Sequence, residues 1–140
     1  MFFSCDTLID SKKDNIKEEK QKIVNLYHKW SQKLIAQDYD GALSLVVPGS
    51  NGEGMTNVAK EAWDKGGQHY FTFTYVQAEL DEEDLKRNYG RAKGNLIFYQ
   101  YNRAWGKSEY ELGFYSSCRK IANQWKIDGC NSNLEVDWWR

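Results

Sequence analysis

The stretch Gly94–Cys130, which reads GNLIFYQYNRAWGKSEYELGFYSSCRKIANQWKIDGC, decides the fold. It predicts three consecutive strands separated by short turns at 106–108 and 119–123: Asn95–Trp105, Glu109–Cys118 and Gln124–Cys130. Apolar and polar residues alternate in the second and third strands, which is typical of strands with one buried face. The first strand has bulky groups on both faces and is predicted to be a central strand, covered on both sides.

The last two strands are predicted to form a hairpin centred near Ile121-Ala122. This register places Cys118 opposite Trp125 and makes the two apolar faces coincide. It also places Cys118 and Cys130 on opposite faces, which predicts that they form no disulfide. The chain has three cysteines in all, and their spacing matches no metal site, so we expect free thiols and no bound metal.

The residues before this stretch predict helices. An apolar stripe at helical spacing indicates one long helix ending near Gln37, with Asp10 or Ser11 as its cap. A short helix at Ala42–Val47, capped by Asp40, is predicted next. The stripe of the first helix consists of Ile16, Ile23, Leu26, Tyr27, Trp30 and Leu34.

Further along, a loop at Pro48–Gly54 precedes a third helix at Asn57–Lys65, which Gly66-Gly67 ends. A long strand at Gln68–Leu80, an acidic turn and a strand at Leu85–Lys93 then lead into the deciding stretch. Helices followed by strands predict an α+β fold: three N-terminal helices packed on a curved antiparallel sheet of four to six strands. We expect a tether at 1–15 and a single domain at 16–140.

Composition limits the classes of function. With 28% charged and 41% hydrophobic residues, the 140-residue chain has an ordinary globular balance. A net charge of −1 argues against a nucleic-acid partner, and the sequence contains no run long enough to span a membrane. The chain has 6 Trp, 9 Tyr and 6 Phe, which indicate either a β-rich core or an aromatic-lined pocket.

Both ends of the chain carry features that bear on location and partners. Phe3-Ser4-Cys5 is similar to the end of a bacterial lipoprotein signal. We therefore expect a cytoplasmic protein or, if the true start lies upstream, one that is lipid-anchored through Cys5. The pair Trp138-Trp139 indicates either folding back onto the sheet or a contact with a partner.

The order and lengths of the elements resemble the nuclear transport factor 2-like superfamily of cystatin-like α+β rolls, to which ketosteroid isomerase and the polyketide cyclases belong. The segments that carry the resemblance, within Lys17–Asn131, are IVNLYHKWSQKLIAQ, DYDGALSLV, TNVAKEAWDK and ELGFYSSCRKIANQWKIDGC. The resemblance implies a sheet curved round the helices and a cone-shaped pocket. Members use this pocket for catalysis, for binding or for dimer contacts.

The isomerases of that superfamily use an aspartate base and an oxyanion hole formed by a tyrosine and an acid. The resemblance implies either Asp38 or Asp40 as the aspartate base and Tyr27 as the tyrosine of the oxyanion hole. The central strand offers Gln100 and Asn102 but no second acid, so the catalytic set is incomplete.

We therefore predict a non-catalytic binding or accessory domain, without a cofactor, that holds a small apolar ligand or a protein partner. The predicted ligand-binding residues are Tyr27, Trp30, Trp63, His69, Phe71, Phe73, Tyr99 and Tyr101. One alternative is an isomerase- or cyclase-like enzyme with a base from Asp38, Asp40 or His69 beside a tyrosine. Another is a lipid-anchored assembly protein of a cell envelope. A homodimer through the outer sheet face is a further expectation, favoured by Tyr115 and opposed by the charged residues beside it.

Overall fold

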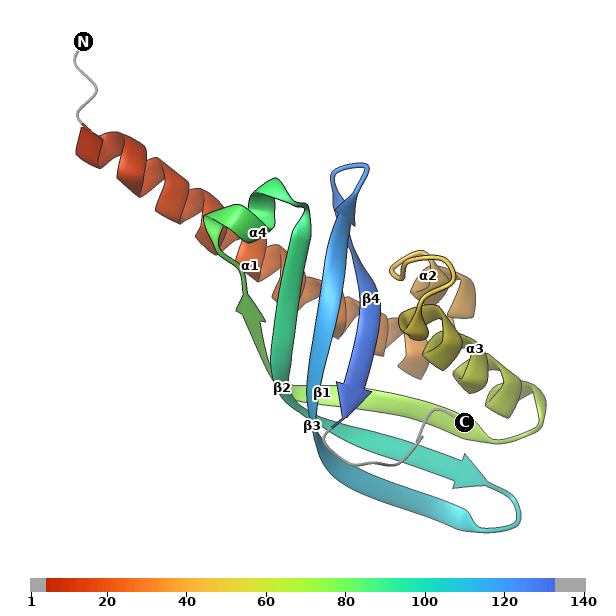
Figure 1. Cartoon of the computed structure of the whole chain (residues 1–140). Helices are drawn as coiled ribbons and strands as arrows, with labels where there is room; N and C mark the ends of the chain where they lie inside the picture. Colours follow the sequence, from red (N-terminus) through yellow and green to blue (C-terminus); the bar gives the residue numbers. More distant parts are fainter. Residues whose placement is uncertain (1–4, 133–140) are drawn as a thin grey trace.

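The computed structural model describes the backbone of residues 5–132 and the side chains of residues 15–131. One antiparallel sheet with the strand order β1-β2-β3-β4 packs against helices, so the fold is α+β (Figure 1). In chain order, the elements are α1 (Cys5–Ile35), α2 (Tyr39–Leu43), α3 (Asn51–Asp64), β1 (Gln68–Glu79), α4 (Glu82–Lys86), β2 (Tyr89–Asn102), β3 (Gly106–Ile121) and β4 (Gln124–Ser132).

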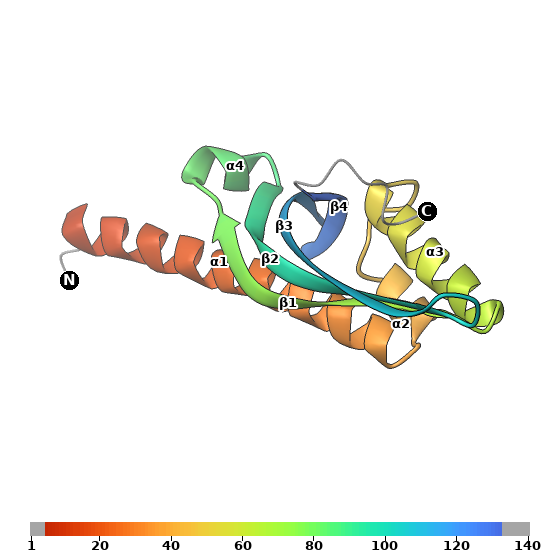
Figure 2. The ribbon, with the colours of Figure 1, turned by 90° about the horizontal axis from the view of Figure 1, so that it is seen from below.

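Helix α1 provides the apolar stripe on which the sheet packs. The stripe is confirmed from Ile23 onward, because Ile23, Leu26, Tyr27, Trp30 and Leu34 are all buried, while Ile16 is half-buried. The helix runs along the sheet in both views (Figures 1 and 2). It is already helical at Cys5, earlier than the cap we expected at Asp10 or Ser11, so most of the predicted tether has a helical backbone.

The short helices begin earlier than predicted. Asp38, and not Asp40, caps α2 by accepting a hydrogen bond from the amide of Gly41. Ser50 caps α3, so residues 51–54, predicted as loop, form its first turn. Gly52 lies in that turn so close to Val46 and Ile127 that a Cβ there would crowd both side chains. A glycine that we interpreted as a loop signal is therefore a contact between helix and sheet.

Strand β2 is continuous, although we predicted two strands that meet at Gly94. The backbone of Gly94 approaches the carbonyl of Tyr75 so closely that no Cβ fits between them. The ladder to β1 shifts between Phe73 and Tyr75, and the strands bend there. Because of this shift, Tyr75 does not follow Phe71 and Phe73 onto the buried face, and it is 53% exposed.

The segment after β1 is helical, where we expected an acidic turn followed by a strand at Leu85–Lys93. Asp81 and Asp84 form a capping box at the start of α4, in which each side chain accepts from the other residue's backbone amide. The acidic run therefore starts a helix instead of forming a simple turn, and the sheet has four strands among the described residues.

The register of the β3–β4 hairpin differs from our prediction. Ala122 and Asn123 both have positive φ, as a two-residue hairpin turn requires, so Ile121 pairs with Gln124 and Cys118 with Ile127. A bulge between Ser117 and Cys118 then places Cys130 on the same buried side as Cys118, not the opposite side. Both thiols are free.

The other long hairpin extends beyond the rest of the sheet. Its turn lies at 103–105, not at the predicted 106–108, and the Asn102 side chain accepts a hydrogen bond from the amide of Trp105. Within the described residues, which end at Ser132, β4 pairs with β3 as far as Phe114, so the described sheet beyond that point consists of β1, β2 and β3. We call this part, residues 68–73, 95–102 and 106–113, the distal arm; it lies at the lower right in Figure 1.

No helix in the described part of the chain is both long enough and apolar enough to cross a lipid bilayer.

Candidate functional site

Four of the predicted ligand-binding residues form the centre of the core. Tyr27 and Trp30 of α1 are 0% exposed, and Phe71 and Phe73 of β1 are buried against them. The ring centroids of Trp30 and Phe71 are 4.8 Å apart, and those of Tyr27 and Phe73 are 5.7 Å apart. These rings fill the space between the helix and the sheet, where we expected a pocket.

The polar side-chain atoms of Tyr27 and Trp30 are hydrogen-bonded within the protein. The Tyr27 hydroxyl donates to Ser116 Oγ at 2.6 Å, and the Trp30 indole donates to Thr56 Oγ1 at 3.0 Å. Burial raises the pKa of the Tyr27 hydroxyl well above its ordinary value, and the neighbouring Cys118 adds to this effect. Tyr27 is therefore neutral and already hydrogen-bonded to β3.

The aspartates considered as bases lie at the start of α2. Asp38 accepts the Gly41 amide at 3.0 Å and pairs with Lys33 at 3.1 Å. The bond from Gly41, followed by the one from Lys33, lowers the pKa of Asp38. Asp40 is exposed. These contacts show a helix cap, and they do not bring an aspartate to the hydroxyl of Tyr27.

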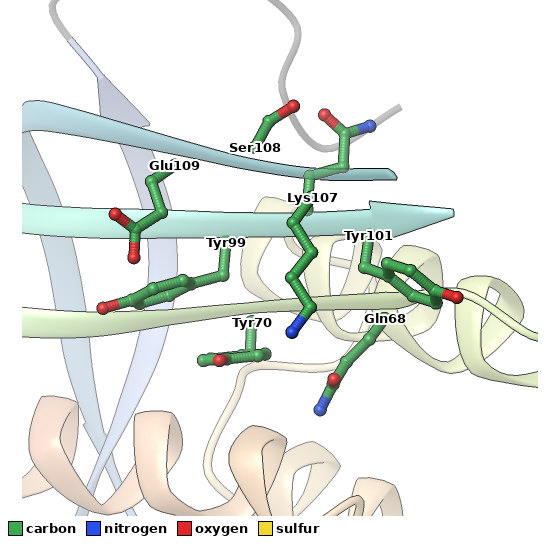
Figure 3. Close-up of a pocket in the computed structure, with 8 residues that line it drawn as sticks. Gln68, Tyr70, Tyr99, Tyr101, Lys107, Ser108 and Glu109 are labelled. Carbon is green, nitrogen blue, oxygen red and sulfur yellow. The ribbon is translucent and has the colours of Figure 1, made fainter. Parts of the chain in front are cut away.

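A pocket of about 500 Å³ lies on the outer face of the distal arm (Figure 3). Tyr70 of β1 and Tyr99 of β2 are direct cross-strand partners, and their rings stack with centroids 4.7 Å apart and planes 18° from parallel. Tyr101 lies in the next row of the sheet, beside Lys107. We call this site the tyrosine pocket. Its lining comprises Gln68, Tyr70, Tyr99, Gln100, Tyr101, Lys107, Ser108 and Glu109.

A second pocket, of about 300 Å³, lies between α3 and the other face of the distal arm and contains His69. The His69 ring lies 5.7 Å from that of Phe98. Burial lowers the pKa of His69, and its Nδ1 has no hydrogen-bond partner within the described structure. The remaining lining residues are Val58, Glu61, Ala62, Lys65, Gly67, Gln100, Tyr101 and Asn102.

The structure therefore divides the predicted residues among several places. Tyr99 and Tyr101 meet in the tyrosine pocket, and Tyr101 also borders the pocket of His69. Trp63 on α3 is 46% exposed and lines neither pocket. In residues 15–131, no cluster of histidine, cysteine or acidic side chains could hold a metal ion.

Sequence reasoning missed Tyr70 and the polar residues around it. Tyr70 alternates with the core residues Phe71 and Phe73, so its outward direction was visible in the sequence. The missing information was the β1–β2 pairing, which brings Tyr70 next to Tyr99.

No family model and no curated protein matches the sequence. Solved structures do match. An NTF2-like protein with a cystatin-like fold from Novosphingobium aromaticivorans aligns with a TM-score of 0.65 and 8% identity, over 98% of this chain and 94% of that one. The chain has the nuclear transport factor 2-like, cystatin-like fold.

Two other solved structures with this fold agree. An NTF-2-like protein of unknown function from Shewanella oneidensis aligns over 80% of this chain and 96% of its own, with a TM-score of 0.54 and 14% identity. The association domain of C. elegans CaMKII aligns over 86% and 99%, with a TM-score of 0.61 and 11% identity. At these identities, the likeness establishes the nuclear transport factor 2-like fold and does not transfer a function.

Proposed function

We propose that this nuclear transport factor 2-like chain is a non-catalytic binding domain whose ligand or partner binds at the tyrosine pocket. One observation carries the proposal. Tyr70, Tyr99 and Tyr101 line a pocket of about 500 Å³ on the outer face of the sheet, while four other aromatic residues expected to contact a ligand, Tyr27, Trp30, Phe71 and Phe73, fill the core. Aromatic rings with a few polar groups around them are typical of ligand sites.

The same arrangement suits either a small molecule or a side chain of a partner protein. The Tyr70–Tyr99 stack provides a fixed aromatic surface, and strands β1 and β2 hold it in place. Little conformational freedom is lost when a ligand packs on such a surface, so binding does not require a deep cavity.

Chemical-shift mapping of the full chain tests this proposal. We expect compounds from a library of small aromatic and polar fragments to shift the amide signals of Tyr70, Tyr99 and Tyr101. The Tyr101→Ala variant should weaken the effect, because it removes an aromatic wall. Trp105→Ala is the matched control, since Trp105 is an exposed aromatic residue of the β2–β3 turn that does not line the pocket. Shifts confined to other parts of the protein would contradict the proposal.

His69 supports an enzyme as the second candidate. Its lowered pKa keeps the imidazole neutral near pH 7, as a general base requires, and it borders a pocket with Tyr101. Deuterium exchange of the protons next to the carbonyl of an enolisable ketone, followed by NMR, tests for such a base. If the unmodified chain exchanges these protons faster than buffer alone and His69→Gln does not, the result favours an enzyme. If the unmodified chain exchanges them no faster than buffer, the result contradicts the enzyme proposal.

A second copy of this chain is the further partner that we propose for the outer sheet face. Tyr75 and Tyr115 are 53% and 58% exposed on that face, and one solved structure of the same fold is an association domain. Sedimentation velocity at increasing concentration should show a dimer that Tyr115→Lys weakens. A chain that stays monomeric at all concentrations would exclude this partner.

Cytoplasmic location remains our proposal, with a lipid anchor at Cys5 as its alternative. An envelope assembly role would rest on Cys5, whose side chain lies outside the described residues, and on Trp138-Trp139, which also lie outside them. A signal sequence in the DNA directly upstream of Met1 would decide for the anchor.

A further inference from the structure

We propose that the tyrosine pocket binds a neutral carbohydrate, that is, an uncharged sugar ring with several hydroxyl groups. This inference rests on the proposed function, because it names the class of ligand for the same site. It depends on the arrangement of charges, amides and rings in the rows of the distal arm. One row contains Gln68, Tyr101 and Lys107, and the next contains Tyr70, Tyr99 and Glu109.

The charges of the lining favour a neutral ligand. Lys107 and Glu109 lie on the same face of β3 and border the same pocket, so the lining has no net charge. Neither residue forms an ion pair within the part of the chain that the structure describes. A phosphate or nucleotide would be attracted by the ammonium of Lys107 but repelled by the carboxylate of Glu109. A cation would be attracted by Glu109 and repelled by Lys107. A hydroxyl group can accept from the ammonium and donate to the carboxylate without a charge penalty.

An uncharged polar group of the lining also matches hydroxyl groups. Gln68 carries an amide with donors and an acceptor, and it lies on the same face of the sheet as the three tyrosines. Its side chain forms no hydrogen bond with another described residue. Gln100 and Ser108 belong to the row of His69, whose side chains lie on the other face. Gln68, Lys107 and Glu109 therefore offer donors and acceptors around one space, and a ligand with several hydroxyl groups can bond to all three.

The aromatic groups provide the apolar contact that a sugar ring needs. One side of a sugar ring presents C–H groups, which carry small positive charges and pack against the negative face of an aromatic ring. The Tyr70–Tyr99 stack lies on one side of the Lys107 side chain, and Tyr101 lies on the other (Figure 3). A sugar in the pocket would contact these rings through its C–H face and the polar rim through its hydroxyls.

The form of the pocket disfavours an entirely apolar ligand. A steroid or lipid gains most from an enclosed apolar cavity, because any surface left in water contributes nothing to binding. The tyrosine pocket is bordered by Lys107, Glu109 and Gln68, and Tyr101 remains 36% exposed. A carbohydrate stays partly hydrated when bound, so an open and half-polar site suits it.

Titration of the full chain with neutral oligosaccharides tests the proposal. The probes are the hexamers of glucose in α-1,4 and β-1,4 linkage, of β-1,4-xylose, of β-1,4-mannose and of N-acetylglucosamine, at millimolar concentration. We expect at least one of them to shift the amide signals of Tyr70, Tyr99 and Tyr101. Because the ligand is neutral, its affinity should not change between low and high salt.

Variants separate a contact with the sugar from a general loss of structure. Tyr101→Ala should weaken binding about tenfold through the lost ring contact. Gln68→Ala should weaken it severalfold while leaving the Tyr70–Tyr99 stack intact, which keeps the test valid if the first variant unfolds. Trp105→Ala, in the turn next to Lys107 but outside the pocket, should bind like the unmodified chain.

The outcomes distinguish the carbohydrate proposal from the proposed function. If no sugar binds but aromatic fragments shift the amide signals of the same three tyrosines, the carbohydrate proposal is wrong and the proposed binding function is supported. If neither sugars nor fragments shift them, both proposals fail. A sugar that perturbs only residues outside the distal arm, or an affinity that falls steeply with salt, would also overturn the carbohydrate proposal.

Discussion

Replacing Trp30 with alanine is expected to lower the free energy of unfolding by about 3–5 kcal/mol, the usual loss when a large aromatic side chain is removed from a core. Trp30 is 0% exposed, and its ring packs against Phe71 and Phe73. The change also removes the indole that donates to Thr56, although Thr56 still donates to the Gly52 carbonyl. Urea unfolding followed by circular dichroism measures the loss, with an unchanged slope expected.

Trp105→Ala is the matched control. Trp105 is 84% exposed in the turn between β2 and β3, so its removal should change the stability by less than about 0.5 kcal/mol. The comparison shows whether Trp30 stabilises the core or contacts a ligand. A Trp30→Ala variant of nearly normal stability that has lost ligand binding would show that Trp30 lines a ligand cavity, as we predicted from the sequence.

The parts of the fold that follow from local patterns could be predicted. The stripe that includes Tyr27 and Trp30 placed α1 on the sheet, and the alternation around Leu112 and Phe114 identified β3 and its buried face. Register could not be predicted in this way. A shift of two residues in the β3–β4 hairpin leaves every apolar residue on the same face, so the alternation fits both registers equally well.

Bulges and close backbone contacts were beyond the sequence pattern for a different reason. A bulge adds one residue to one strand, so its presence depends on the partner strand and not on the residues at the bulge. The bulge beside Cys118 therefore overturned our prediction that Cys130 lies on the opposite face, and the shift beside Tyr75 places its side chain outside the core. Gly94 carried a signal, but a glycine that ends a strand and a glycine that lets two strands approach look alike in the sequence.

The residues of the candidate site could not be predicted from local sequence patterns either. An excess of aromatic residues predicts aromatic contacts but does not tell whether a ring meets the core or a ligand. Phe71 and Tyr70 are neighbours in β1, yet one lies in the core and the other borders the tyrosine pocket. Only the pairing of β1 with β2 brings Tyr70 next to Tyr99, and no local pattern encodes that pairing.

A buried carboxylate connects α1 to the β3–β4 hairpin. Glu19 is 4% exposed; its Oε1 accepts from Lys120 Nζ at 2.9 Å, and its Oε2 accepts from Trp125 Nε1 at 2.6 Å. The exposed Lys22 adds a weaker contact at 3.4 Å. Burial alone would raise the pKa of Glu19, but the bonds from Lys120 and Trp125, with the charges of Lys120 and Lys22, outweigh it, so the pKa is lowered.

We expect Glu19→Gln to destabilise the protein by about 2–3 kcal/mol at pH 7, because a charged bond is lost and the nearly buried ammonium of Lys120 is left without its counter-charge. The amide can still accept from Trp125, which keeps the loss below that of a complete deletion. Glu83→Gln is the matched control, since Glu83 pairs with Lys86 on an exposed surface and should contribute less than about 0.5 kcal/mol.

The effect of Glu19→Gln should depend on pH in one direction. Because the pKa of Glu19 is lower in the folded protein than its ordinary value of 4.5, the charge stabilises the fold above that value. The stabilisation is lost as the pH falls through the lower folded pKa, so the unmodified chain should approach the variant in stability as the pH falls below 4.5. Urea unfolding at pH 7, 5 and 3 measures this. A difference that stays constant across the range would mean that the amide disturbs packing and that the charge of Glu19 contributes nothing.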